Sequence, residues 1–225
     1  EPEAASALNC DGARLIAEAT AARGIALVHV STDYVFDGSK STPYVETDPT
    51  GPLGVYGRTK EAGERAVAAA NPRHVILRTA WVHSPYGQNF VKTMLRLAGE
   101  RDEVRVVDDQ IGSPTYAPHL ASVILDIAQR LAQPGTGDGL HGVFHAAGAG
   151  EATWAEVARL VFERAVALGG RSARVVPIAT ADYPTAAARP ANSRLDCSRL
   201  RSTYGLALPD WRQGVEDCVG RLIAS

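Results

Sequence analysis

The chain has 225 residues, of which 45% are hydrophobic and 21% charged, and its formal net charge is −2 at pH 7. This length suffices for one large domain or for a domain with an additional lobe. The small net charge gives no indication of a basic face for nucleic acid, and no apolar run reaches the roughly 20 residues of a membrane-spanning helix. We therefore expect neither nucleic acid nor a membrane as a partner.

The start of the chain and its metal-binding residue types point to an ordinary intracellular protein. The chain begins Glu1-Pro2-Glu3, which is acidic and unlike a signal peptide, so a cytoplasmic location is expected. The cysteines form no Cys-x-x-Cys pair and the histidines no His-Glu-x-x-His pattern, so no metal site is predicted. We expect the cysteines to be small buried side chains in a reducing compartment.

The first predicted element is a helix from residue 2 to about residue 22, followed by Gly24 as a stop. Its apolar side is formed by Leu8, Leu15, Ile16 and Ala19. Residues 25–30 are apolar and rich in β-branched side chains, which predicts a buried strand. That strand ends directly at Ser31-Thr32-Asp33.

Residues 38–54 are rich in Gly, Pro, Ser, Thr and Asp and predict a long loop. A loop of this length in a compact domain is often functional, so we expect it to border the site. The helix after it carries Tyr56 and Lys60 and continues through alanines that recur at helical spacing.

Strands and helices then alternate along the chain. Strands are predicted at residues 74–77, 104–107, 143–145 and 175–178, and helices at 89–97, 118–131, 153–165 and from 210 onward. Thr153 and Glu156 fit a capping box at the start of one helix, and residues 179–193 predict an irregular segment. The alternation predicts an α/β fold with a parallel sheet.

The segment from Gly137 to Gly142 spells the dinucleotide fingerprint G-x-G-x-x-G. That fingerprint must follow a strand and open a helix, so that the N-terminus of the helix meets the pyrophosphate. Here a predicted helix precedes it and a predicted strand follows. We therefore interpret this segment as a surface turn.

Tyr56 and Lys60 lie four residues apart on the predicted helix, so both side chains are on one face. A nearby ammonium favours the phenolate and would lower the pKa of the tyrosine from its reference of about 10. A Tyr/Lys pair at this spacing is more often a solvated face. The hydroxyl-bearing residues at the preceding strand end favour a site, because ligands bind at the carboxyl ends of parallel strands.

These residues belong to a longer series of motifs. Ser31 to Gly38 and Pro52 to Glu64 resemble the extended short-chain dehydrogenase/reductases and, among these, the dTDP-4-dehydrorhamnose reductases. Further segments with this resemblance are Leu77-Arg78-Thr79-Ala80-Trp81-Val82, Asn89-Phe90-Val91, Asp109 to Thr115, and Ala188 to Ser193. The resemblance covers nearly the whole chain, in order.

The resemblance implies NADPH- or NADH-dependent reduction of dTDP-4-dehydro-L-rhamnose to dTDP-L-rhamnose, a precursor of cell-surface polysaccharide. It implies that Tyr56 donates a proton to the carbonyl oxygen, and that Lys60 lowers the pKa of Tyr56 and holds the nicotinamide ribose. It also implies that Thr32 hydrogen-bonds at the carbonyl. Residues implied in binding the dTDP-sugar are Thr32, Asp33, Trp81, Asn89 and Arg189.

The resemblance also implies a domain organisation. Residues 1–110 would be the C-terminal portion of a Rossmann-like dinucleotide-binding domain, and residues 111–225 mainly a smaller, intertwined α/β substrate lobe. Family members often form homodimers, in some cases with magnesium, although the sequence shows no magnesium site. NAD or NADP preference is set in the family by a residue that would lie upstream of residue 1.

Two other functions remain open from the sequence. One is a different sugar-nucleotide epimerase or dehydratase of the same superfamily, although the run from Ser31 to Gly38 resembles the reductases more. The other is a non-catalytic regulatory subunit resembling that of methionine adenosyltransferase. The presence of Thr32, Tyr56 and Lys60 together favours an enzyme.

No usable glycine-rich phosphate loop occurs in this sequence, and in the family that loop would lie upstream of residue 1. We therefore expect the 225-residue chain alone to bind nicotinamide cofactor weakly or not at all. Isothermal titration calorimetry of the isolated chain with NADPH measures this directly. Micromolar binding would contradict the expectation.

Overall fold

A computed structural model describes residues 1–133, 138–183 and 189–224 of the chain. The chain divides into two compact units. The first comprises Glu1–Thr79, Ala121–Ala146 and Ala187–Ala207, and the second comprises Ala80–Leu120, Ala147–Ala186 and Leu208–Ser225.

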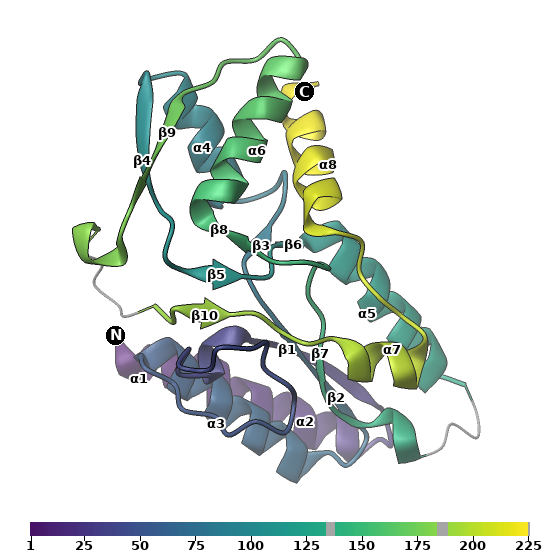
Figure 1. The fold of residues 1–225 in the computed structure, drawn as a ribbon. Coiled ribbons are helices and arrows are strands. Elements are labelled where there is room, and N and C mark those ends of the chain that lie inside the picture. Colours follow the sequence, from purple (N-terminus) through teal and green to yellow (C-terminus); the bar gives the residue numbers. More distant parts are fainter. Residues whose placement is uncertain (134–137, 184–188, 225) are drawn as a thin grey trace. The chain divides into compact units, whose positions relative to one another are not determined.

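The first unit contains a parallel sheet in the order β1-β2-β7 (Figure 1). Its strands are β1 (Leu27–Thr32), β2 (His74–Thr79) and β7 (Gly142–His145). The short helices η2 (Asp33–Val35) and η3 (Asp138–Leu140), the helix α7 (Ser198–Tyr204) and the short strand β10 (Asn192–Ser193) also belong to this unit. The middle strand is fully buried at Val75, Ile76 and Leu77, as expected for an apolar run inside an α/β sheet.

Helices α1 (Pro2–Ser6), η1 (Ala7–Gly12, a π-helix) and α2 (Ala13–Ala21) form one helical segment. The predicted helix from residue 2 to about 22 and its stop at Gly24, where φ is +66°, are therefore confirmed. The side of the helix that is buried differs from the prediction. Ala13 and Ala17 pack into the core, whereas Leu8, Leu15 and Ile16 are exposed.

Helix α3 (Val55–Ala70) lies very close to its neighbours because two of its residues are glycines. A Cβ at Gly57 would overlap the carbonyl oxygen of Tyr34 in η2, and a Cβ at Gly63 would overlap the carbonyl oxygen of Asn9 in η1. The absence of side chains at these positions thus lets α3 approach the backbone on two sides. This contact determines where Tyr56 and Lys60 lie.

The second unit combines parallel and antiparallel strand pairs with helices. β3 (Val82–His83) pairs in parallel with β6 (Thr115–Tyr116), and β4 (Glu103–Val107) pairs in parallel with β9 (Arg174–Ile178). β5 (Ile111–Gly112) pairs in antiparallel orientation with β8 (Ala152–Thr153). A hydrophobic core lies among α4 (Phe90–Ala98), α6 (Trp154–Ala167) and α8 (Trp211–Ile223). The expected α/β fold with parallel strands is thus confirmed.

Several local predictions are also confirmed. Thr153 and Glu156 form the capping box of α6, and α5 (Ala117–Leu131) buries Leu120, Val123, Ile127 and Leu131. The glycine fingerprint leads through η3 into strand β7, as predicted for a turn, although Gly137 lies outside the described residues. The irregular segment after residue 179 contains η4 (Thr180–Asp182) and β10, and its residues 184–188 also lie outside the described part.

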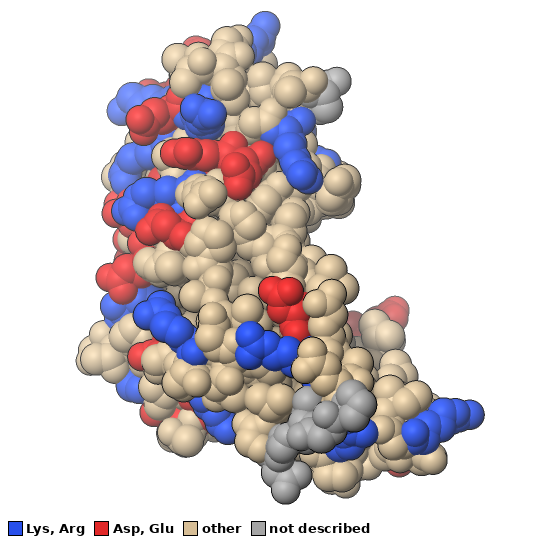
Figure 2. All heavy atoms as spheres, turned by 90° about the vertical axis from the view of Figure 1, so that its right-hand side faces the viewer, with Lys and Arg blue, Asp and Glu red and all other residues tan. Residues whose placement is uncertain are grey.

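Charged side chains of both signs are interspersed on the face of the molecule shown in Figure 2. This agrees with the small net charge of the sequence. Within the described ranges, no helix is long and apolar enough to cross a membrane.

The close approach of α3 to η1 gives a testable consequence. Gly63→Ala is expected to lower the free energy of unfolding by about 1–3 kcal/mol, because the methyl group overlaps the Asn9 carbonyl and the helix must shift. Gly220→Ala in α8 is the matched control: a Cβ there meets no atom within 4 Å, so helix propensity alone should stabilise the protein by up to about 1 kcal/mol. Urea unfolding measures both changes, and equal effects would contradict the packing argument.

Candidate active site

The carboxyl end of β1 carries the first group of predicted site residues. Ser31 and Thr32 are the last two residues of the strand, and Asp33 begins η2. The Thr32 hydroxyl donates to Oδ1 of Asp33 at 3.1 Å and accepts from the backbone N–H of Tyr34 at 3.3 Å. The turn after the strand is therefore held by the same hydroxyl that is predicted to act on the substrate.

Asp33 is 3% exposed, and its Oδ2 has no hydrogen-bond partner among the described residues. Burial raises the pKa of Asp33 to about 6, partly offset by hydrogen bonds from Ser193 and Thr32 that favour the carboxylate. A direct contact of Asp33 with substrate stays a prediction. The geometry connects Asp33 to Thr32 and Ser193.

Tyr56 and Lys60 lie in the first two turns of α3. The Tyr56 side chain is half exposed, and its ring lies edge-on to the ring of Tyr34 with centroids 5.9 Å apart. The Lys60 Nζ donates to the backbone carbonyl of Val30 at 2.7 Å. The helix therefore holds both side chains at the carboxyl end of β1.

The expected direction of the Tyr56 pKa is wrong for this structure. Partial burial raises the pKa of Tyr56 above its usual value, and the negative charge of Asp33 adds to this, while a hydrogen bond from Thr32 acts in the opposite direction. Burial also lowers the pKa of Lys60. Since the pKa of Tyr56 lies above the usual tyrosine value of about 10, Tyr56 is a protonated phenol at neutral pH.

Arg189 is exposed, and its positive charge lowers the pKa of Tyr34, which burial otherwise raises. Arg189 thus lies within electrostatic range of Tyr34. Sequence reasoning missed Tyr34 and Ser193 as site residues. Both stand inside the motifs that carry the resemblance, but only the fold shows that Tyr34 packs on Tyr56 and that Ser193 bonds Asp33.

The loop at residues 38–54 is held by the segment that follows Arg189. The Asn192 amide donates to the carbonyls of Lys40 and Thr42 at 2.6 and 2.9 Å, and Tyr44 forms an isolated parallel bridge with Leu195. A Cβ at Gly38 would collide with Pro190. The Gly51 N–H also donates to the Val35 carbonyl, so the loop lies next to the residues after β1. That the loop borders a site stays a prediction.

Trp81 and Asn89 belong to the second unit. Trp81 has φ +46°, a left-handed conformation that is strained for a non-glycine residue, and its ring stacks on Trp154 with centroids 3.6 Å apart. The Trp154 indole N–H donates to Gln110 at 3.2 Å. Asn89 is the N-cap of α4, where its Oδ1 accepts from the Lys92 N–H, and its amide donates to the Ser84 carbonyl at 2.7 Å. Roles of both residues in substrate binding stay predictions.

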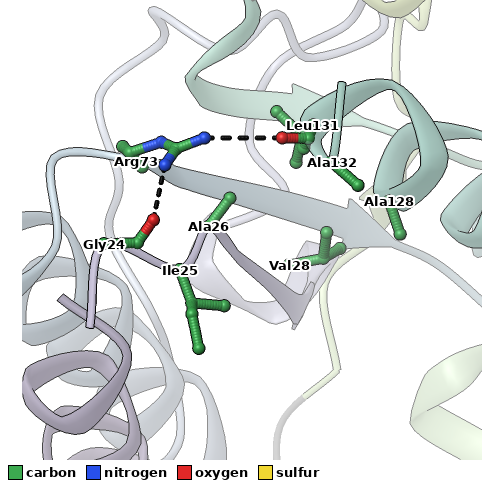
Figure 3. Close-up of a pocket in the computed structure, with 8 residues that line it drawn as sticks. All are labelled: Gly24, Ile25, Ala26, Val28, Arg73, Ala128, Leu131 and Ala132. Atoms are coloured by element: carbon green, nitrogen blue, oxygen red, sulfur yellow. Dashed lines mark hydrogen bonds between the residues drawn. The ribbon is translucent and has the colours of Figure 1, made fainter. Parts of the chain in front are cut away.

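A pocket of about 340 Å³ lies away from these residues (Figure 3). It is lined by the amino end of β1 and the C-terminal part of α5, and the Arg73 guanidinium donates to the carbonyls of Gly24 and Leu131 at its rim. The lining is mainly aliphatic. The pocket lies at the amino end of β1, whereas Thr32 lies at its carboxyl end.

No cluster of three or more His, Cys, Asp or Glu side chains suited to a metal ion occurs within the described ranges. The hydroxyl, phenol and ammonium groups at the end of β1 are the side chains suited to proton transfer. Three such groups at the carboxyl end of a strand in a parallel sheet form the arrangement expected of a dehydrogenase/reductase.

Comparison with known proteins identifies the family. The family model described as "RmlD substrate binding domain" matches residues 1–223. A curated dTDP-4-dehydrorhamnose reductase from Sinorhizobium fredii is 51% identical over 223 residues, which cover 99% of this chain and 75% of the relative. The chain belongs to the dTDP-4-dehydrorhamnose reductase family.

Other dTDP-4-dehydrorhamnose reductases support the same assignment. The protein of this name from Aggregatibacter actinomycetemcomitans is 44% identical over 221 residues, covering 96% of this chain and 74% of the relative. A crystal structure of the Bacillus anthracis reductase in complex with NADP has a TM-score of 0.86 at 37% identity and covers 95% of this chain and 72% of that chain. The chain thus spans about three quarters of the length of these relatives of the dTDP-4-dehydrorhamnose reductase family.

Burial of Asp33 predicts a pH-dependent stability. An acid whose pKa is raised in the folded state stabilises the fold below its unfolded pKa, near 4, and this stabilisation is lost as the pH rises through about 6. The shift corresponds to roughly 3 kcal/mol. Wild type is therefore expected to lose about that much unfolding free energy relative to Asp33→Asn between pH 4 and pH 7, measured by urea unfolding with far-UV circular dichroism.

The control is Asp37→Asn. Hydrogen bonds from Ser39 and Tyr44 lower the pKa of this exposed carboxyl, so its stabilisation is present above about pH 4 and is lost only as the pH falls further. The difference between wild type and Asp37→Asn should therefore stay nearly constant from about pH 4 to about pH 7. A difference between wild type and Asp33→Asn that is constant with pH would contradict the assignment of a raised Asp33 pKa.

Proposed function

We propose that this chain carries the proton-transfer residues of an NADPH- or NADH-dependent reductase that converts dTDP-4-dehydro-L-rhamnose to dTDP-L-rhamnose. The observation that carries the proposal is the grouping of Thr32, Tyr56 and Lys60 at the carboxyl end of β1, held by the Lys60 to Val30 hydrogen bond. Membership of the dTDP-4-dehydrorhamnose reductase family supports the substrate class. The NADP complex of the Bacillus anthracis relative supports the cofactor.

In the proposed reaction, the bound reduced nicotinamide supplies a hydride to C4 of the sugar. The ketone oxygen gains negative charge, and Tyr56 transfers its phenolic proton to this oxygen, which completes the alcohol. The raised pKa of Tyr56 suits this direction, because a reduction needs the protonated phenol at neutral pH. Thr32 is proposed as the second donor to this oxygen, where charge develops in the transition state, and its hydroxyl proton would turn there from Asp33 Oδ1.

Lys60 is proposed to hold the ribose of the nicotinamide cofactor. Val30 accepts from one of its three N–H donors, so the others can bind a pair of ribose hydroxyls. The positive charge of the ammonium also stabilises the phenolate that Tyr56 becomes after proton transfer. The partly buried position of Lys60 beside β1 is compatible with this role.

Arg189 is proposed to bind the diphosphate, since its guanidinium is exposed and lies within electrostatic range of Tyr34. Contacts of Asp33, Trp81 and Asn89 with the sugar nucleotide are proposed from the family resemblance. The division at residue 110 into cofactor and substrate parts, a cytoplasmic location and a homodimer also remain predictions.

The proposal is tested by NADPH and NADH oxidation with freshly prepared dTDP-4-dehydro-L-rhamnose. The assay uses the protein extended at its N-terminus to the length of its relatives, of which this chain spans about three quarters. Tyr56→Phe is expected to lower kcat by about a hundredfold or more, the usual scale for loss of a general acid. The control Tyr86→Phe removes an exposed phenol of the second unit and should leave kcat unchanged.

The pH dependence gives a second readout. Since the pKa of Tyr56 is raised, the rate of the wild type should fall only at alkaline pH above the usual tyrosine value of about 10. Absence of turnover in a folded wild type would overturn the proposal in favour of the regulatory-subunit alternative. Full turnover by Tyr56→Phe would retain a reductase but remove Tyr56 from its mechanism.

A further inference from the structure

The face of α3 that presents Tyr56 and Lys60 carries a third polar residue, Glu64. The three residues are spaced at intervals of four along the helix, so their side chains point in one direction. Lys60 reaches the backbone of Val30, and Glu64 reaches the hydroxyl of Ser31. Two consecutive residues of β1, directly before Thr32, are thus bonded to one face of α3.

The Glu64 carboxylate is engaged from two strands. Ser31 Oγ donates to its Oε1 at 2.5 Å, while Arg78 donates through Nε at 3.0 Å and through Nη2 at 2.6 Å. The side chains of Glu64 and Arg78 are each 6% exposed. This is a buried, bidentate ion pair with an added hydroxyl donor, a geometry that leaves the carboxylate little freedom to move.

Ser31 and Arg78 are register partners across β1 and β2, and the next pair in the ladder is Thr32 and Thr79. Both partners bond one carboxylate, so Glu64 joins the two strands one residue before Thr32. His145 is the register partner of Arg78 on β7. Burial and the charge of Arg78 lower the pKa of His145 to about 3, so His145 stays neutral beside Arg78.

We propose that Glu64 is a positioning residue for the reaction, acting through Ser31 to fix the end of β1, and with it Thr32, relative to Tyr56 and Lys60. The inference rests on the reductase function proposed above. The reacting groups are not touched by Glu64 itself. Glu64 holds β1, which carries Thr32, in a fixed position relative to α3, which carries Tyr56 and Lys60. Small displacements of these groups lower the rate of proton transfer.

A stability role alone would not need this arrangement. Removing two charges from water costs free energy that their mutual attraction often does not offset. A well-packed pair of apolar side chains at the same place would therefore stabilise the fold as well. The ion pair adds hydrogen bonds of fixed geometry that join Glu64 of α3 to Arg78 of β2. The Ser31 hydroxyl also donates to Glu64, so β1 is bonded to the same carboxylate at the residue next to Thr32.

The test uses the same N-terminally extended protein and the mild variant Ser31→Ala, which leaves the Glu64–Arg78 pair intact. Thr50→Val is the matched control, because the Thr50 hydroxyl likewise donates to a glutamate of α3, Glu61, but lies in the loop and not on β1. We expect Ser31→Ala to lower kcat about tenfold with KM for both substrates within about twofold. Thr50→Val should change kcat less than about twofold.

A double-mutant cycle identifies the route of the effect. If Ser31 acts through Thr32 and Tyr56, Ser31→Ala should have no further effect on the residual rate of Tyr56→Phe. A spectrophotometric titration of the Tyr56 phenol, taken as the difference from Tyr56→Phe, gives a readout without turnover. Hydrogen bonding between Thr32 and Tyr56 lowers the pKa of the phenol, so a displacement of Thr32 in Ser31→Ala should raise that pKa further.

The outcomes separate the two proposals. Wild-type turnover with equal kcat values for Ser31→Ala and Thr50→Val and an unchanged titration would overturn positioning and leave the reductase intact. Additive effects of Ser31→Ala and Tyr56→Phe would also overturn it, because the two residues would then act independently. Absence of wild-type turnover would overturn the function and this inference together, and the titration would then report only on the structural coupling of Ser31 to Tyr56.

Discussion

The buried ion pair between Glu64 and Arg78 is the interaction on which the arrangement of the first unit depends. Removing either partner would leave an uncompensated charge at a position that is 6% exposed, which typically costs several kcal/mol. The pair lies where α3, β1 and β2 meet, so the helix, the strand end and the ladder between the strands must be formed together. The guanidinium also lies over the ring of Phe36, with 5.1 Å between Cζ and the centroid, which links the residues after η2 to the same place.

The order of elements could be predicted from the sequence because it depends on local patterns. The β-branched run before Ser31, the alanines after Lys60 and the Thr153/Glu156 capping box all lie where the structure has β1, α3 and the start of α6. The side of the first helix could not be predicted in this way. Ala13 and Ala17 are buried because α3 comes close through Gly63, a contact between distant parts of the chain, whereas Leu8 and Leu15 gave the stronger apolar pattern.

The pKa values in the candidate site also depend on contacts between distant parts of the chain, which local sequence patterns do not predict. The spacing of Tyr56 and Lys60 was enough to place both on one helix face, but the direction of the Tyr56 pKa depends on burial and on the charge of Asp33. The ammonium of Lys60 donates to the Val30 carbonyl, a contact that the sequence did not indicate, and its expected action on the phenol stays a prediction. Ser193 affects Asp33 from the far end of the sequence, and no local pattern carries that information.

The tryptophans of the chain, Trp81, Trp154 and Trp211, all belong to the second unit, while the groups proposed to transfer protons belong to the first. Indole fluorescence therefore reports on one unit without contribution from the other. The near-parallel rings of Trp81 and Trp154, with an angle of 10° between their planes, should also couple as an exciton pair in circular dichroism. An unfolding curve followed by tryptophan fluorescence therefore describes the second unit alone, whereas the seven tyrosines are divided between the units, with Tyr34, Tyr44, Tyr56 and Tyr204 in the first.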